Sequence, residues 1–75
     1  MTAVEVLFRY GAPPNESAMI AFGQLSDVYG IRCLRLQEAA RTVRVEYDAT
    51  RLTEAKVEGL LRAAGFDITE KMALA

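Results

Sequence analysis

Four short stretches of the chain alternate apolar and polar side chains with a period of two residues, the pattern of strands with one buried face. They are Val4–Tyr10, Ile31–Gln37, Thr42–Tyr47 and the brief run Phe66–Ile68, which is short enough for an edge strand. Only four residues, 38–41, separate the second run from the third, so these two are expected to form an antiparallel hairpin. The pattern therefore predicts a sheet with one face buried and the other in contact with water.

The stretch after the first strand has apolar side chains at the three- and four-residue spacing of one helical face. We expect Asn15 or Ser17 to accept the first free backbone N–H groups, and Gly30 to end the helix as a C-cap. The predicted apolar face consists of Ala18, Ala21, Phe22, Leu25, Val28 and Tyr29.

A second helix is predicted between the third and fourth strands, with Thr53 as its N-cap and Gly65 as its end. The order strand, helix, strand, strand, helix, strand is the split βαβ arrangement, a ferredoxin-like α/β (α+β) sandwich. We expect a four-stranded antiparallel sheet with both helices on one face. The whole chain, 1–75, is expected to be one domain, with its core at about 4–68 and a loose C-terminal tail at 69–75.

Composition and charge narrow the possible functions. Nine basic and ten acidic residues give a net charge of -1, so neither nucleic acid nor anionic lipid is an expected partner. The apolar runs are far shorter than a membrane-spanning helix needs, and the N-terminus lacks the features of a secretion signal. We expect a cytoplasmic chain that does not insert into a membrane. With no histidine, no paired nucleophile and base, and no Gly-rich phosphate loop, it is not expected to be an enzyme.

From position 30 onward, four landmarks follow one another in a recognisable order. They are Gly30-Ile31 before the second strand, Tyr47-Asp48 at the end of the hairpin, Thr53 before the second helix, and Gly65-Phe66 after it. In this order and spacing the chain resembles the heavy-metal-associated domain, the module of copper chaperones and of metal-pumping ATPases. The resemblance implies a ferredoxin-like fold and a metal-binding loop before the first helix. It also implies that this end of the domain meets transfer partners.

The loop itself departs from that family. The family carries Gly-Met-x-Cys-x-x-Cys there, and counting back from Gly30 places its glycine, methionine and two cysteines at Gly11, Ala12, Pro14 and Ser17. Proline has no side-chain donor, and a serine hydroxyl is a hard, weak ligand for a soft ion. Shifting the count by one residue gives Pro13 and Glu16, which do not restore a thiolate pair. We therefore expect no cofactor and no ordinary Cu(I) or Zn(II) site within one chain.

Counting back through the loop also conflicts with the alternation of the first strand. The count turns Leu7 and Arg9 inward, whereas alternation alone turns Val6, Phe8 and Tyr10 inward. A loop that differs by one residue, or a bulge in the strand, would remove the conflict.

Cys33 is the chain's single cysteine, and it is opposite in phase to Leu34 and Leu36. It is therefore expected on the outer face of the sheet or at a local irregularity, as a small packed or half-exposed thiol. The alternative is a thiolate ligand in a metal site, or half of a disulfide, completed between two chains.

These observations favour a degenerate heavy-metal-associated-like domain that works as a protein-protein interaction or regulatory module. A protein partner is expected to contact the loop and the start of the first helix, at Gly11, Ala12, Pro13, Pro14, Asn15, Glu16 and Ser17. A polar sheet face with Arg32, Arg35, Arg44 and Glu46 is a second candidate, either simply solvated or docking an acidic partner. A homodimer could form through a sheet edge. The alternative function is a metal carrier whose site is completed between chains, through Cys33 or through a partner's ligands.

Overall fold

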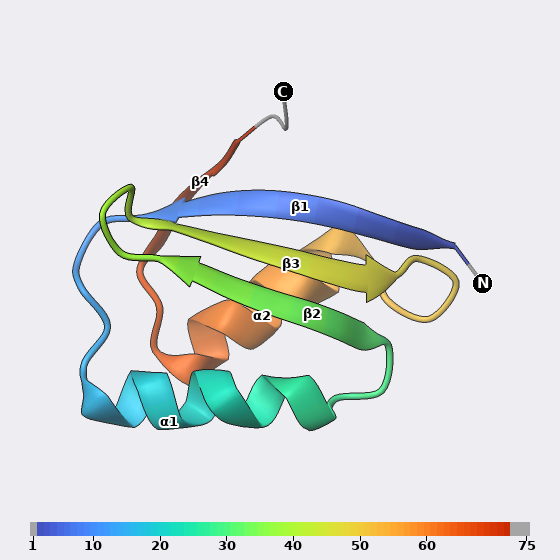
Figure 1. The fold of residues 1–75 in the computed structure, drawn as a ribbon, viewed down its shortest axis with the longest axis horizontal. Helices are drawn as coiled ribbons and strands as arrows, with labels where there is room; N and C mark the ends of the chain where they lie inside the picture. The colour runs from blue at the N-terminus through green and yellow to red at the C-terminus, as the bar shows by residue number, and fades with distance from the viewer. Residues whose placement is uncertain (1, 73–75) are drawn as a thin grey trace.

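The computed structural model describes residues 2–72 of the chain. The elements run in the order β1 (Ala3–Tyr10), α1 (Glu16–Gln24), the 3-10 helix η1 (Leu25–Asp27), β2 (Ile31–Gln37), β3 (Thr42–Asp48), α2 (Glu54–Ala64) and β4 (Ile68–Met72), as Figure 1 shows. This is the predicted strand and helix order. None of the helices in this part of the chain is long and apolar enough to cross a membrane.

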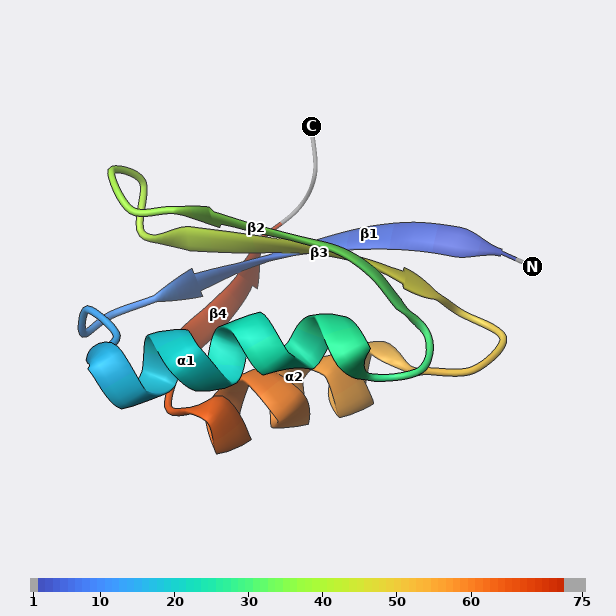
Figure 2. The same ribbon diagram turned by 60° about the horizontal axis from the view of Figure 1, so that its bottom comes forward.

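The four strands form one antiparallel sheet in the order β2-β3-β1-β4. Both helices lie on the same side of this sheet (Figure 2). Within residues 2–72, no element covers the opposite side, which we call the open face. The predicted ferredoxin-like sandwich is confirmed, with one core between the sheet and the helices.

The core confirms the phase that alternation gives to the first strand. Val6, Phe8 and Tyr10 point inward and are 3%, 0% and 2% exposed, so the inward phase that the count gave to Leu7 and Arg9 is wrong. A register shift between Arg9 and Tyr10 interrupts the pairing of β1 with β4. The other fully or nearly buried apolar side chains are Ala18, Leu25, Val43, Val45, Tyr47, Leu52, Val57, Leu61, Phe66 and Ile68.

Helix α1 is shorter than its apolar spacing predicts, because it ends at Gln24 rather than near Gly30. The Ser26 hydroxyl donates a hydrogen bond to the Gly23 carbonyl at 2.9 Å, which competes with continued helical bonding. The backbone then tightens into η1, where the Val28 N–H donates to the Leu25 carbonyl. Val28 itself is extended, so the helix has already stopped there.

The residues after η1 therefore have different roles from those predicted. Tyr29 is 71% exposed rather than part of a helical apolar face, and the Arg51 guanidinium lies 4.3 Å from its ring centroid. Gly30 is not the C-cap of α1. It has φ +103° in the turn into β2, and a Cβ there would lie 3.0 Å from the Leu52 side chain.

Strand β4 begins and ends later than predicted. It covers Ile68–Met72, so the part of the expected loose tail at 69–72 is in fact strand; residues 73–75 lie outside the described part of the chain. The segment carries charges instead of a clear apolar alternation, and pairing with β1 organises it. The ion pair Arg9–Glu70, at 3.6 Å, connects the strand to β1, and the ion pair Lys71–Glu54, at 2.8 Å, connects it to α2.

Helix α2 has the caps that the sequence predicts. The Thr53 hydroxyl accepts the Lys56 N–H at 3.2 Å. At the other end Gly65 adopts the left-handed conformation, with φ +111°, and its N–H donates to the carbonyls of the last turn.

Candidate functional site

The β1–α1 loop begins with a pair of hydrogen bonds to Asp67, which precedes β4. The Gly11 N–H donates to the Asp67 backbone carbonyl at 2.9 Å, and the Ala12 N–H donates to the Asp67 Oδ2 at 3.1 Å. A Cβ on Gly11 would lie only 2.8 Å from that Oδ2 atom, so glycine permits this close approach. The start of the loop is thus fixed by a residue far away in the sequence.

The β2–β3 hairpin fixes the same point from the other side. The Tyr10 N–H donates to the Arg41 carbonyl at 3.0 Å, and the Arg41 Nη1 donates to the Gly11 carbonyl at 3.1 Å. Arg41 has φ +53°, a conformation that is unfavourable for a long side chain. A strained arginine at the hairpin therefore holds the backbone of the loop.

Helix α1 begins at the end of this loop with Asn15 as its N-cap. The Asn15 Oδ1 accepts the Ala18 N–H at 2.8 Å, so of the two predicted caps the structure uses Asn15. Ser17 instead lies exposed in the first helical turn. Pro13 and Pro14 both precede the cap, where extended backbone leads into the helix and a missing N–H breaks no helical bond.

A shallow hollow lies between the loop and the hairpin, lined by Tyr10, Pro13, Pro14, Glu38 and Arg41. Burial raises the pKa of the Tyr10 phenol, the negative charge of Glu38 raises it further, and the positive charge of Arg41 opposes them. The hollow therefore holds a neutral hydroxyl beside one charge of each sign.

Aromatic side chains pack in the core beneath the β1–α1 loop. The Tyr10 and Phe66 rings meet edge to face with centroids 5.6 Å apart, and the Phe22 ring lies 5.3 Å from that of Phe66. These rings supply packing and no metal ligand.

The donor set of the loop does not fit a soft metal. Pro14 and Ser17, the positions matched to the family's cysteines, offer no thiolate, and neither do Pro13 and Glu16. Across residues 2–72, no group of three or more histidine, cysteine, aspartate or glutamate side chains could hold a metal ion.

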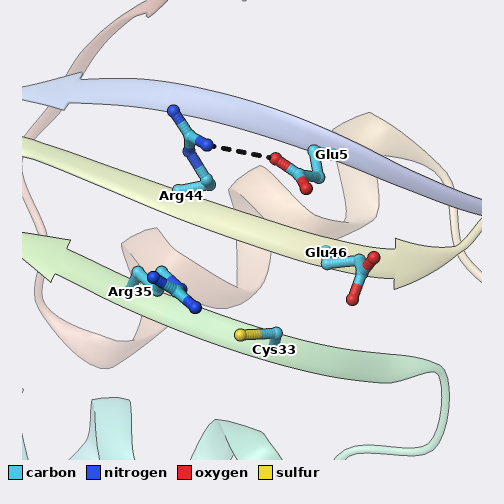
Figure 3. Close-up of a pocket in the computed structure, with 5 residues that line it drawn as sticks. All are labelled: Glu5, Cys33, Arg35, Arg44 and Glu46. Atoms are coloured by element: carbon cyan, nitrogen blue, oxygen red, sulfur yellow. Dashed lines mark hydrogen bonds and ion pairs between the residues drawn. The ribbon is translucent and has the colours of Figure 1, made fainter.

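Cys33 lies on the open face of the sheet, half-buried. It lines a second hollow with Glu5, Arg35, Arg44 and Glu46, and Figure 3 shows its sulfur among these charged groups. The register of β2 against β3 shifts between Ile31 and Cys33, which is a bulge. Both expected placements of Cys33 are therefore correct: alternation with Leu34 turns it outward, and the bulge before it lets Ile31 pack against the core.

No protein-family model matches the chain, and no curated protein matches it. Among solved structures, the chain is similar to the crystal structure of oxidized MerP from Ralstonia metallidurans CH34. The TM-score is 0.73 and the sequence identity 14%, over 91% of this chain and 96% of MerP.

The chain has the fold of MerP.

At 14% identity the likeness establishes the fold, which confirms the structural part of the resemblance to heavy-metal-associated domains. The chain thus has this fold, and its β1–α1 loop contains no Cys-x-x-Cys pair. Its specific activity has to be inferred from its own residues.

Two residues that shape the loop, Arg41 and Asp67, were not found from the sequence. Arg41 lies in a short polar connection, where nothing in the local pattern indicates a left-handed backbone. Asp67 lies between the core residues Phe66 and Ile68, and its bonds to the loop depend on how β4 pairs with β1. The roles of Arg41 and Asp67 become visible only when the fold places them beside the loop.

Proposed function

We propose that this chain is a non-enzymatic protein-interaction or regulatory module that contacts a protein partner through residues 11–17, without a bound metal. The proposal rests on the hydrogen bonds that fix the backbone at the start of the loop. Its first residues are held by Asp67 and Arg41, that is, by hydrogen bonds within the chain. A loop that already has its bound shape loses little conformational entropy when a partner docks.

The surface next to the loop supports this proposal. Ala12, Pro13 and Asn15 are exposed, and α1 continues from them with Met19 at 37% and Ile20 at 59% exposure. Methionine and other apolar side chains beside a polar loop are typical of the centre of a protein interface. The combination offers a partner apolar contacts next to a fixed backbone.

The alternative function is a metal carrier whose site is completed between chains, through Cys33 or through ligands from a partner. The half-buried position of Cys33 on the open face favours it, because the thiol is turned away from its own core. One cysteine per chain gives one thiolate ligand, so at least one further ligand has to come from another molecule.

Titration of the reduced protein with Cu(I) and Zn(II), read by native mass spectrometry, separates the two functions. A metal-free interaction module shows no tight binding, and Cys33→Ser changes nothing. Tight binding of one metal per dimer that Cys33→Ser abolishes would replace the proposal with the shared-thiolate carrier.

The contact surface is tested with two exposed alanines, Ala12 in the loop and Ala63 in α2. Partner proteins retained by wild type and by Ala63→Arg are expected to be lost from Ala12→Arg, because the new side chain blocks the loop. Equal retention by both variants would contradict residues 11–17 as the contact surface.

A further inference from the structure

Two neighbouring rows of side chains on the open face, running across β2, β3 and β1, carry charges that the chain pairs only in part, whereas Arg9 and Glu70 in a further row pair with each other. In the register of the sheet, the first row from β2 through β3 to β1 is Cys33, Glu46 and Glu5. The next row is Arg35, Arg44 and Leu7. Figure 3 shows the acidic pair and the basic pair side by side. We call these the acidic row and the basic row.

Each row places like charges directly opposite each other on neighbouring strands. Glu5 faces Glu46 and Arg35 faces Arg44, and such cross-strand pairs are unfavourable. One diagonal ion pair, between the Arg44 Nη1 and the Glu5 Oε2 at 3.4 Å, offsets part of this repulsion. Both of its side chains are about 40% exposed, 42% and 40%, so the offset is small.

The other two charges of these rows have no opposite partner within residues 2–72. Neither Arg35 nor Glu46 makes an ion pair with any of the described residues. The Nε of Arg44 is buried and has no hydrogen-bond partner. The open face therefore has one surplus of each sign, separated along the strand direction.

This pattern is complementary to itself in a single orientation. When two copies meet face to face about a two-fold axis parallel to the strands, each row lies over the same row of the partner, and like charges oppose. About a two-fold axis perpendicular to the strands, each acidic row lies over a basic row. Opposite potentials across an interface favour association and fix its register.

We propose that a second copy of this chain docks face to face on the open face of the sheet, with each acidic row over the partner's basic row. In this arrangement Glu46 lies over the partner subunit's Arg44, and Cys33 lies over the partner subunit's Arg35. Residues 11–17 take no part in the contact. The dimer is therefore independent of the proposed loop interaction.

The arrangement also predicts where the two Cys33 thiols lie. They are offset by one row, about 7 Å, and by the spacing of stacked sheets, about 10 Å, which places their Cα atoms about 12 Å apart. A disulfide requires Cα atoms within about 7 Å of each other. The dimer is thus distinct from a disulfide dimer, and a bismaleimide with a flexible spacer joins the two thiols.

Sedimentation velocity over a concentration series tests the proposal. Wild type is expected to shift from monomer to dimer with concentration at low salt, and to return towards monomer at high salt. Arg35→Glu and Glu46→Arg each remove the net charge of one row, so each is expected to raise the dimer Kd on the order of tenfold. Lys56→Glu on α2, which is on the other side of the sheet, makes the same change in net charge as Arg35→Glu and leaves the Kd unchanged.

Mixing the two variants provides the decisive comparison. The acidic row of Arg35→Glu and the basic row of Glu46→Arg are both intact, so the mixed pair regains one of the two row contacts. The mixture is expected to dimerise more tightly than either variant alone. Both substitutions also replace a like-charge cross-strand pair with an opposite one, so the fold is expected to be at least as stable.

Four results would overturn the dimer: a wild type that stays monomeric throughout, reversals that leave its Kd unchanged, an equal effect of Lys56→Glu, or no gain on mixing. Bismaleimide cross-linking of wild type that depends on concentration and is lost in Arg35→Glu supports it. Cross-linking that persists undiminished in Arg35→Glu contradicts it.

Discussion

The Asp67 carboxylate accepts the backbone N–H of Ala12 at 3.1 Å, across a sequence separation of 55 residues. The same aspartate accepts the Gly11 N–H through its carbonyl. In this domain, an aspartate at the approach to β4 thus fixes the start of the β1–α1 loop. The start of the loop is therefore held by hydrogen bonds within the folded chain.

Removal of the Asp67 side chain tests this anchor. Asp67→Ala is expected to lower the free energy of unfolding by about 1 kcal/mol, since one hydrogen bond to a charged acceptor is lost. Amide hydrogen exchange is expected to quicken at Ala12, while the Gly11 N–H keeps its bond to the backbone. Asp27→Ala, at an exposed aspartate in η1, is the control. Unchanged exchange at Ala12 would show that the anchor contributes nothing.

Two glycines in or next to α2 are expected to respond oppositely to alanine. Gly65→Ala forces a side chain into a left-handed backbone and places its Cβ 3.1 Å from the Ala18 Cβ, which costs about 1–2 kcal/mol. Gly59 has nothing within 4 Å of its would-be Cβ, so Gly59→Ala is expected to stabilise by about 0.5–1 kcal/mol. Urea unfolding of both variants measures the difference, and equal effects would contradict the C-cap assignment.

The N-cap of α1 provides a test between the two residues that the sequence allowed. Asn15→Ala removes the acceptor of the Ala18 N–H and is expected to cost about 1 kcal/mol. Ser17→Ala is expected to cost much less, because Ser17 lies in the first turn and its side chain caps nothing. Thermal unfolding measures both. A larger loss in Ser17→Ala would mean that the cap is Ser17.

Stability at low pH is expected to depend on Asp48. The Thr50 hydroxyl, 2.6 Å away, and then the Thr50 N–H hold the pKa of Asp48 below its ordinary value of 3.8. A depressed folded-state pKa gives stability that is present above the unfolded pKa and is lost as pH falls through the folded one. Thr50→Val is therefore expected to lower the urea midpoint at neutral pH, with a deficit that shrinks well below pH 3.8.

Thr69→Val is the control for that series. Its hydroxyl donates to the Arg9 carbonyl at 3.1 Å, an acceptor that does not titrate. The deficit of Thr69→Val is expected to stay constant with pH. A constant deficit in Thr50→Val as well would contradict the role of Asp48.

Introducing two thiolates tests whether the loop can form a metal site. In a Cys33→Ser background, Pro14→Cys with Ser17→Cys is expected to gain Cu(I) binding, because two thiolates three residues apart at a helix start suit a soft ion. Competition with a chromophoric Cu(I) chelator measures the affinity.

The shifted pair, Pro13→Cys with Glu16→Cys, is the matched comparison in the same background. It is expected to bind Cu(I) more weakly. Tighter binding by the shifted pair would mean that the loop is offset by one residue from the alignment counted back from Gly30. That offset would agree with the inward orientation of Phe8 and Tyr10. No gain by either pair would mean that the loop has lost the geometry of the site.

Periodicity predicted the fold well where one face of an element is buried. The alternation of β1 and β3 places Val6, Phe8, Val43 and Val45 in the core, as expected. Strand β4 was predicted too short because Glu70 and Lys71 interrupt the alternation. The pairing of β4 with β1, and the ion pairs of these two side chains, are contacts between distant parts of the chain.

For the candidate site, the sequence showed only which side chains the loop offers. The residue types at 11–17 showed that thiolates are missing, which needs no coordinates. The hydrogen bonds that hold the loop come from Arg41 and Asp67, and both depend on tertiary structure. The charge rows of the open face likewise require the register of three strands, which a bulge beside Cys33 alters.

The hydrogen bond that Arg41 donates to the Gly11 carbonyl also has a consequence for the rate of association with a partner. A surface that is fixed before the partner arrives needs no rearrangement after the first collision, so docking there is limited by diffusion and orientation. The strained backbone at Arg41, with φ +53°, is part of the same arrangement. For the proposed contact at residues 11–17, changes at the hairpin tip are thus expected to alter the association rate even where the partner does not touch the hairpin.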